Sequence, residues 1–339
     1  MSPARPLRVL GALVALLAGA LGFGVALTWA PDLPVESLRE RWAPPPSRFV
    51  DVKGLKVHLR DEGRPDDPAP LVLIHGTSAS LHTWEGWVAA LRGTRRVITF
   101  DLPGFGLTGP NGANDYRIAA YVRFVLDTLD TLGVQRFVVG GNSLGGEVAW
   151  QVAAAAPDRA ERLILVDAGG YAFRPESLPI GFHLARTPGV NRLLEYTLPR
   201  SLMEASVRNV YGDPGRVTPA LVDRYEALTL RAGNRRALAH RFSQLDFGAG
   251  AARIATLRLP TLILWGGRDR LIPPENGRNF QRDIPGACLV IFDDLGHVPH
   301  EEDPERTVAA VVDFLATPVP VRALPAHAAL AEPATPTRR

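Results

Sequence analysis

The sequence predicts a doubly wound α/β fold with a mostly parallel sheet, an inserted helical cap and one N-terminal transmembrane helix. Three observations support this prediction. Short runs rich in Val, Ile and Leu alternate with helical stretches from about residue 49 to residue 317, as in a sheet buried on both faces. The alternation stops between residues 170 and 252, where only helical patterns occur. A long uncharged segment precedes the globular part.

The N-terminal segment 1–30 is interpreted as a single-pass membrane anchor. Its apolar run Val9–Ala30 contains no charged residue and spans about 33 Å as a helix, against about 30 Å for the hydrocarbon core of a bilayer. A cleavable signal peptide is the main alternative, because the cationic start and Thr28-Trp29-Ala30 fit one, although its apolar region is usually shorter. A buried helix is the third alternative.

The orientation of this anchor depends on the basic residues at its two ends. Arg5 and Arg8 favour a cytoplasmic N-terminus. Arg39, Arg41 and Arg48 lie within about 20 residues of the other end and nearly balance them. We expect the globular part on the non-cytoplasmic side.

Two proline-rich segments flank the globular part. Residues 31–48 contain Pro31, Pro34 and the triplet Pro44-Pro45-Pro46, which predict a stiff, extended linker. Residues 318–339 are rich in proline and alanine and predict a disordered tail, to which we assign no function.

The predicted core comprises residues 49–169 and 253–317. Phe49–Val52 and Leu55–Leu59, joined around Gly54, predict an antiparallel hairpin at the edge of the sheet. Six further apolar runs predict the parallel strands, namely Leu71–Ile74, Val97–Phe100, Phe137–Val139, Leu163–Val166, Leu262–Trp265 and Leu289–Phe292. Helical spacing predicts the helices Ile118–Leu132, Val148–Ala156 and Thr307–Leu315.

The segment 170–252 predicts a helical cap, because an insertion of this length at one connection of an α/β sheet forms a separate lid. Its helical candidates are Ser201–Val210, Pro219–Arg231 and Asn234–Leu245. Their apolar side chains include Leu202, Met203, Leu221, Tyr225, Leu228, Leu238 and Phe242. Most of these residues must pack the lid onto the body, and some are expected to line an apolar pocket.

A reactive serine is predicted at the turn after the third parallel strand. Gly141-Asn142-Ser143-Leu144-Gly145 has the form G-x-S-x-G between an apolar strand and an Ala-rich helix. Such a turn holds the serine in a strained conformation with its hydroxyl above the sheet, and the glycines avoid clashes. A glycine-rich turn with an incidental serine is the plain alternative.

A serine hydroxyl needs a base, and the base needs an acid that orients it. Asp269 follows the strand Leu262–Trp265, and His297 follows the strand Leu289–Phe292. Ligands of open α/β sheets bind beyond the carboxyl ends of the strands, so both residues are expected on the same sheet edge as Ser143.

Five motifs in this order resemble the α/β-hydrolase superfamily. They are Leu73-Ile74-His75-Gly76, Asp101-Leu102-Pro103-Gly104-Phe105-Gly106, Gly141-Asn142-Ser143-Leu144-Gly145-Gly146, Gly266-Gly267-Arg268-Asp269 and Gly296-His297. The resemblance covers about residues 50–316. It implies that Ser143 is the nucleophile, His297 the general base and Asp269 its orienting acid. It also implies an oxyanion hole formed by the backbone N–H groups of Thr77 and Leu144.

Several neighbouring residues have other interpretations. Asp167 ends the strand Leu163–Val166, where some members of the superfamily carry the acid, but it lacks the Gly-Gly-Arg-Asp context of Asp269. We interpret His300 as a surface residue or a support for the site, His75 as a structural hydrogen-bonding group, and Asp101 as part of a loop-shaping turn.

Composition and motifs exclude other classes of function. The net charge is +3, and no stretch concentrates the arginines, which argues against a nucleic-acid partner. The single Cys288 has no cysteine partner for a disulfide or a zinc site. No cluster has the spacing of metal ligands and no glycine-rich loop has the P-loop form, so we expect neither a metal nor a cofactor.

The serine at the turn restricts the chemistry. Relatives that resemble haloalkane dehalogenases and epoxide hydrolases carry Asp there, whereas Ser143 indicates acyl transfer. The anchor and lid resemble those of membrane-bound monoacylglycerol lipases and esterases, so the expected partners are the membrane and a small ester or lipid-like substrate. The alternatives are a carbon–carbon bond hydrolase of the same fold and a non-catalytic ligand-binding or scaffold protein.

Overall fold

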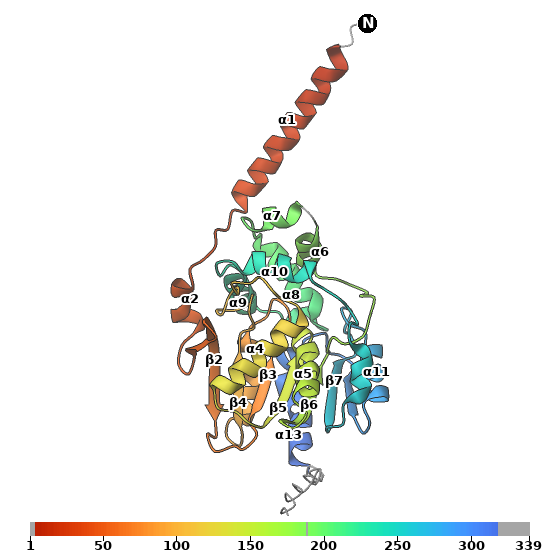
Figure 1. Cartoon of the computed structure of the whole chain (residues 1–339). Helices are drawn as coiled ribbons and strands as arrows, with labels where there is room; N and C mark the ends of the chain where they lie inside the picture. The colour runs from red at the N-terminus through yellow and green to blue at the C-terminus, as the bar shows by residue number, and fades with distance from the viewer. Residues whose placement is uncertain (1–3, 188, 318–339) are drawn as a thin grey trace, which may run out of the picture.

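An eight-stranded sheet forms the centre of the computed structural model, which describes residues 4–187 and 189–317 (Figure 1). The strand order is β1-β2-β4-β3-β5-β6-β7-β8. The hairpin of β1 and β2 lies at one edge of the sheet. Strand β2 pairs antiparallel with β1 on one side and with β4 on the other, and all other neighbouring strands pair in parallel. The strands are β1 (Arg48–Val52), β2 (Leu55–Gly63), β3 (Leu71–Ile74), β4 (Arg96–Phe100), β5 (Phe137–Asn142), β6 (Ala160–Val166), β7 (Thr261–Gly266) and β8 (Cys288–Phe292).

Helices cover both faces of this sheet. Alternate strand residues enter two separate clusters, as the two-residue period of a strand requires. Val72 and Ile74 pack in the cluster that includes α4 (Ile118–Thr131), α5 (Leu144–Ala155) and α11 (Glu275–Asp283). Leu71 and Leu73 pack on the opposite face, where α3 (Glu85–Leu91) and α13 (Pro304–Ala316) lie. The predicted doubly wound, mostly parallel fold is therefore confirmed.

The connection from β6 to β7 is helical. In the described part of this segment there are helices and no strand of the sheet, and Figure 1 places these helices between the sheet and the N-terminal helix. They are α6 (Ile180–Arg186), α7 (Val190–Leu194), α8 (Arg200–Val210), α9 (Pro219–Thr229) and α10 (Asn234–Ser243), with short 3-10 turns η2 (Pro214–Arg216) and η3 (Ala251–Thr256). The division of the chain at residues 170 and 252 stays a prediction.

The N-terminal helix α1 (Ala4–Leu27) projects away from the globular part (Figure 1). Its segment Val9–Leu27 has a mean hydropathy of 2.3, and none of it is buried. This segment is long and apolar enough to cross a membrane. A signal sequence meets the same criteria of length and composition. So does the core helix of a soluble protein, but such a helix is mostly buried.

The chain after α1 attaches to the cap. Ala30 N–H donates to the Tyr196 carbonyl at 2.9 Å, and Leu198 N–H donates to the Thr28 carbonyl at 3.2 Å. The Trp29 and Tyr196 rings stack with centroids 5.6 Å apart. The end of α1 is thereby held against the segment between α7 and α8.

The proline-rich segment 31–48 differs from the extended linker that the sequence predicts. It contains a helix, α2 (Val35–Trp42), because its prolines lie before and after the helix and not within it. Leu38 of α2 is buried against Leu107 and Leu228. This apolar contact supplies stabilisation that a short isolated helix lacks. The predicted tail 318–339 lies outside the described residues.

Candidate active site

Ser143 lies at the sharp turn between β5 and α5. Its φ of 56° and ψ of −118° are strained for a residue with a side chain. The strain is held by close neighbours: Ser143 N–H donates to the Val166 carbonyl at 3.0 Å. A Cβ atom on Gly145 would overlap the backbone carbonyl of Ile74, and one on Gly141 would overlap the backbone of Gly145. These glycines allow strand and helix to meet at the serine.

His297 and Asp269 form a buried pair at the ends of β8 and β7. Nδ1 of His297 lies 2.7 Å from Oδ2 of Asp269. The other carboxylate oxygen accepts the N–H groups of Leu271 at 2.8 Å and Ile272 at 3.0 Å. An ionised carboxylate only accepts, so Nδ1 carries the proton and Nε2 has a free lone pair. Nε2 is buried and has no hydrogen-bond partner within the described residues, and His297 and Ser143 line the same cavity.

Thr77 and Leu144 flank Ser143 through their backbones. In the described part of the chain, neither N–H group donates to a protein acceptor, so both are available to a ligand oxygen. The loop before Thr77 is fixed by His75, whose Nδ1 lies 2.8 Å from the Gly76 carbonyl. Its Nε2 accepts from Leu102 N–H at 2.9 Å, so the ring is neutral, and burial lowers its pKa.

Asp167 occupies the alternative acid position but does not reach the histidine. Its Oδ1 accepts Gly266 N–H at 2.9 Å, and its Oδ2 has no hydrogen-bond partner among the described side chains and backbone. Burial and the nearby charge of Asp269 raise the pKa of Asp167 well above its usual value. A neutral carboxyl does not orient and stabilise an imidazolium as an ionised one does.

Asp167, Asp269 and His297 are also the residue types of a metal site, with ligand atoms within 4.8 Å of one another. The oxygens of Asp269, however, already accept hydrogen bonds from His297, Leu271 and Ile272. The hydrogen bonding favours a catalytic pair, and the absence of a metal stays a prediction.

Two neighbouring groups support this edge of the sheet. His300 is fully buried and not at the surface: its Nε2 lies 3.0 Å from Thr83 Oγ1, and its ring centroid lies 4.1 Å from that of Trp84. Asp101 shapes its loop as expected, because it accepts the N–H groups of Leu81 and Leu107, each at 2.7 Å.

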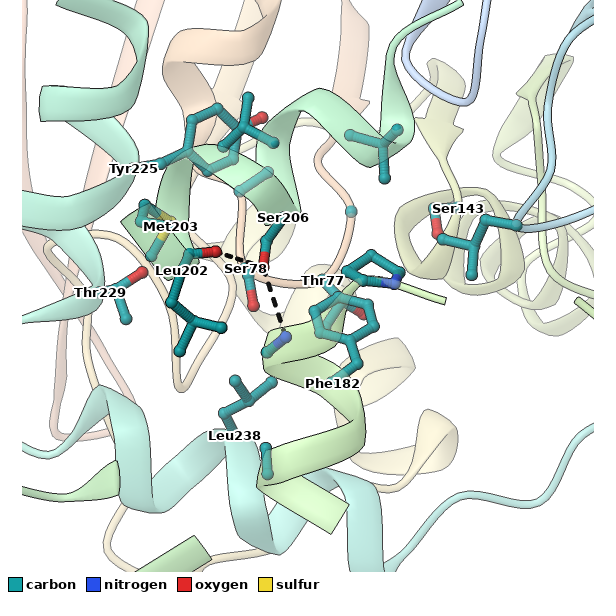
Figure 2. A pocket seen from close by; sticks show the side chains of 18 of the residues that line it. Thr77, Ser78, Ser143, Phe182, Leu202, Met203, Ser206, Tyr225, Thr229 and Leu238 are labelled. Carbon is teal, nitrogen blue, oxygen red and sulfur yellow. Dashed lines mark hydrogen bonds between the residues drawn. The ribbon is translucent and has the colours of Figure 1, made fainter. Parts of the chain in front are cut away.

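A largely apolar cavity extends from Ser143 under the cap. In Figure 2, Ser143 lies at one end of the view, with Met203 and Thr229 at the other. The hydroxyl of Ser206 is already used, since it accepts Gly181 N–H at 3.3 Å and donates to the Leu202 carbonyl at 2.8 Å. A ligand in the middle of the cavity therefore contacts mainly apolar side chains.

The predicted lid residues divide between this cavity and other contacts. Leu202, Met203, Tyr225 and Leu238 line the cavity. Phe242 lines a second cavity that also reaches Ser143, together with Glu147 and Arg241, which sequence reasoning missed. Leu221 and Leu228 pack elsewhere in the cap. Helical spacing identified the inward faces of the cap helices, but it did not show which cavity or neighbouring side chains each face contacts.

A family model described as the alpha/beta hydrolase fold matches residues 69–304. The chain belongs to this family. The matched range contains the candidate residues Thr77, Ser143, Asp269 and His297. The protein is thus a hydrolase of the α/β fold.

Similar proteins within this family differ in activity. A 2-hydroxymuconate semialdehyde hydrolase of Pseudomonas putida is 30% identical over 81% of this chain and 95% of its own. A solved meta-cleavage product hydrolase of Pseudomonas fluorescens IP01 is 27% identical with a TM-score of 0.68, over 79% of this chain and 97% of its own. A solved membrane phospholipase A, described as a bacterial virulence factor, is 26% identical with a TM-score of 0.65, over 92% of this chain and 98% of its own.

Proposed function

We propose that this α/β hydrolase cleaves carboxylic esters of apolar or lipid-like acids through an acyl-enzyme. The observation that carries the proposal is the shared cavity of Ser143 and His297, whose free Nε2 and Asp269-bound Nδ1 fit a general base.

In the proposed mechanism, Nε2 of His297 takes the Ser143 hydroxyl proton as Oγ attacks the ester carbonyl. The N–H groups of Thr77 and Leu144 stabilise the oxyanion. The tetrahedral intermediate collapses, the carbon–oxygen bond breaks, and His297 returns the proton to the leaving alcohol. Water, deprotonated by His297, then cleaves the acyl-enzyme and releases the acid.

The apolar cavity supports an apolar acyl group. Its walls of Leu202, Met203 and Leu238 would bury the chain, at about 0.8 kcal/mol for each methylene. The cavity also borders α7, and the chain after α1 is held next to that helix. A substrate dissolved in a bilayer would therefore lie close to the cap.

The location in a membrane is part of this proposal. The segment 9–30 would cross the bilayer once, with the catalytic part on the non-cytoplasmic side. The large exposed apolar side chains of α1, among them Leu13, Leu16 and Phe23, support a lipid environment, since such a surface is unfavourable in water. The stacked Trp29 and Tyr196 have the amphipathic rings that are enriched at membrane interfaces.

Carbon–carbon bond hydrolysis is the second candidate. It is favoured by the similarity to the 2-hydroxymuconate semialdehyde hydrolase and the meta-cleavage product hydrolase. In that case the same residues would act on a vinylogous diketone and not on an ester.

A substrate panel separates the candidates. We expect the purified protein to hydrolyse p-nitrophenyl acyl esters and to react with a fluorophosphonate probe, whereas Ser143→Ala should do neither. Turnover of a 2-hydroxy-6-oxo-dienoate without ester turnover would favour the carbon–carbon hydrolase. Absence of labelling and of both turnovers would favour a scaffold protein.

A further inference from the structure

Ser143 stands between two cavities. The first is the apolar cavity under the cap. The second, with about 780 Å³ of space including its open mouth, begins at Thr77, Ser143 and Leu144. Its remaining wall contains five aromatic side chains and two buried ionisable ones, and its main members are Tyr171, Phe173, Phe242, Phe247, Glu147 and Arg241. An ester has two sides, so a serine between two cavities can hold the acyl group in one and the alcohol in the other.

Arg241 faces the second cavity without a protein partner. Arg241 is only 4% exposed, and its guanidinium makes no hydrogen bond and no ion pair within the described residues. Its Nε atom is fully buried and unpaired. Burying an unpaired charge is costly, and burial lowers the pKa of Arg241. A guanidinium only donates hydrogen bonds, so this position favours a ligand that supplies an acceptor.

Glu147 supplies the complementary group. It lies one helical turn after Ser143 on α5, is 8% exposed, and its carboxyl group makes no hydrogen bond in the described part of the protein. It forms no ion pair with Arg241, although each affects the charge of the other. Burial, opposed by the charge of Arg241 and reinforced by that of Asp246, raises the pKa of Glu147 to about 7.

From these residues we propose that the second cavity binds the alcohol side of the ester and selects a neutral alcohol that carries free hydroxyl groups. A hydroxyl can donate to the Glu147 carboxylate and accept from the Arg241 guanidinium, which neither a hydrocarbon nor an anion does. The opposite charges of the two groups favour a neutral ligand. The inference rests on the proposed ester hydrolysis and deepens it from the acyl side to the alcohol side.

The test compares two esters that differ only in these hydroxyls, glycerol 1-monobutyrate and n-propyl butyrate. We expect the wild-type kcat/KM ratio of the first to the second to exceed 10. Arg241→Met and Glu147→Gln should each lower this ratio by about tenfold to hundredfold, the effect of losing a hydrogen bond to a charged group. The matched control is Arg236→Met on α10, whose side chain is 65% exposed and pairs with Glu195; it should leave the ratio unchanged.

Other outcomes overturn the inference in distinct ways. If the wild type cleaves both esters with equal kcat/KM, or both variants keep the wild-type ratio, the alcohol subsite is refuted while ester hydrolysis stands. If Arg241→Met affects only a glycerol ester that carries a phosphate, the ligand is an anion and the neutral alcohol is wrong. If neither ester is cleaved, ester hydrolysis and this inference fail together. Glu147→Gln preserves side-chain volume, and thermal melting checks that each variant is folded.

Discussion

Asp167 and Asp269 bring their carboxyl groups within 4.8 Å of each other, but only Asp269 hydrogen-bonds the ring of His297. The two acids have different partners: one oxygen of Asp167 accepts the Gly266 N–H, while one oxygen of Asp269 accepts two backbone N–H groups of the loop that follows it. Asp269 is thus positioned to pair with His297, while burial and the neighbouring Asp269 raise the pKa of Asp167.

This difference predicts unequal effects of the two isosteric substitutions. Asp269→Asn should lower kcat by about 10⁴-fold, because an amide neither selects the reactive tautomer of His297 nor stabilises its charged form. Asp167→Asn should lower kcat by less than about tenfold, since an amide can replace a neutral carboxyl. Steady-state kinetics on one p-nitrophenyl ester measures both, and the opposite ranking would assign the acid to Asp167.

Gly145→Ala should destabilise the protein by about 3 kcal/mol or more, because the new methyl group would overlap the Ile74 carbonyl and force strand and helix apart. Urea denaturation measures this loss. Gly93→Ala is the matched control: Gly93 is exposed and has no atom within 4 Å of the added group, so its effect should stay within about 1 kcal/mol. Equal stability of the two variants would contradict the tight elbow.

The buried carboxyl of Glu147 predicts a pH-dependent stability. Its pKa is about 7 in the folded protein, against a reference value of 4.5, so the folded state retains a proton that the unfolded state releases. This group therefore lowers stability progressively as pH rises from about 4.5 to about 7, and the loss persists above that range. Glu147→Gln removes the effect.

At pH 8 we expect the free energy of unfolding of Glu147→Gln to exceed that of the wild type by up to about 3 kcal/mol, so the variant should melt at a higher temperature. Near pH 4 the two proteins should differ little. Calorimetry from pH 4 to pH 8 measures this, and parallel melting curves would show that the carboxyl titrates normally.

The apolar cavity predicts a preference for longer acyl chains. kcat/KM should rise from acetyl to butyryl and up to decanoyl p-nitrophenyl esters, by at most about fourfold for each methylene. Leu202→Trp should move the optimum to shorter chains because it fills the cavity, whereas Leu221→Trp, which alters the cap outside this cavity, should not. A steady fall from acetyl upward in the wild type would refute an acyl pocket.

The candidate catalytic residues could be proposed from the sequence because each stands in a local pattern. Ser143 has its glycines and its strand-to-helix context, Asp269 follows the buried strand β7, and His297 follows the apolar edge strand β8. The strand β3 was recognisable for a similar reason, since its four residues are apolar and buried on both faces.

Features that depend on tertiary contacts could not be found in this way. The helix α2 gains its stability from Leu38, which meets Leu107 and Leu228, residues distant in sequence. Glu147 and Arg241 resemble charges on solvated helix faces, and no local pattern indicates that both are buried around one cavity. They border one cavity although they come from α5 and α10, which is a property of the whole fold.

The attachment of the chain after α1 to the cap has a mechanical consequence. The hydrogen bonds of Thr28 and Ala30 lead to the cap segment at Tyr196 and Leu198, and not to the sheet. If α1 were held in a bilayer, these contacts would fasten the cap next to it, with the sheet on the far side of the cap (Figure 1).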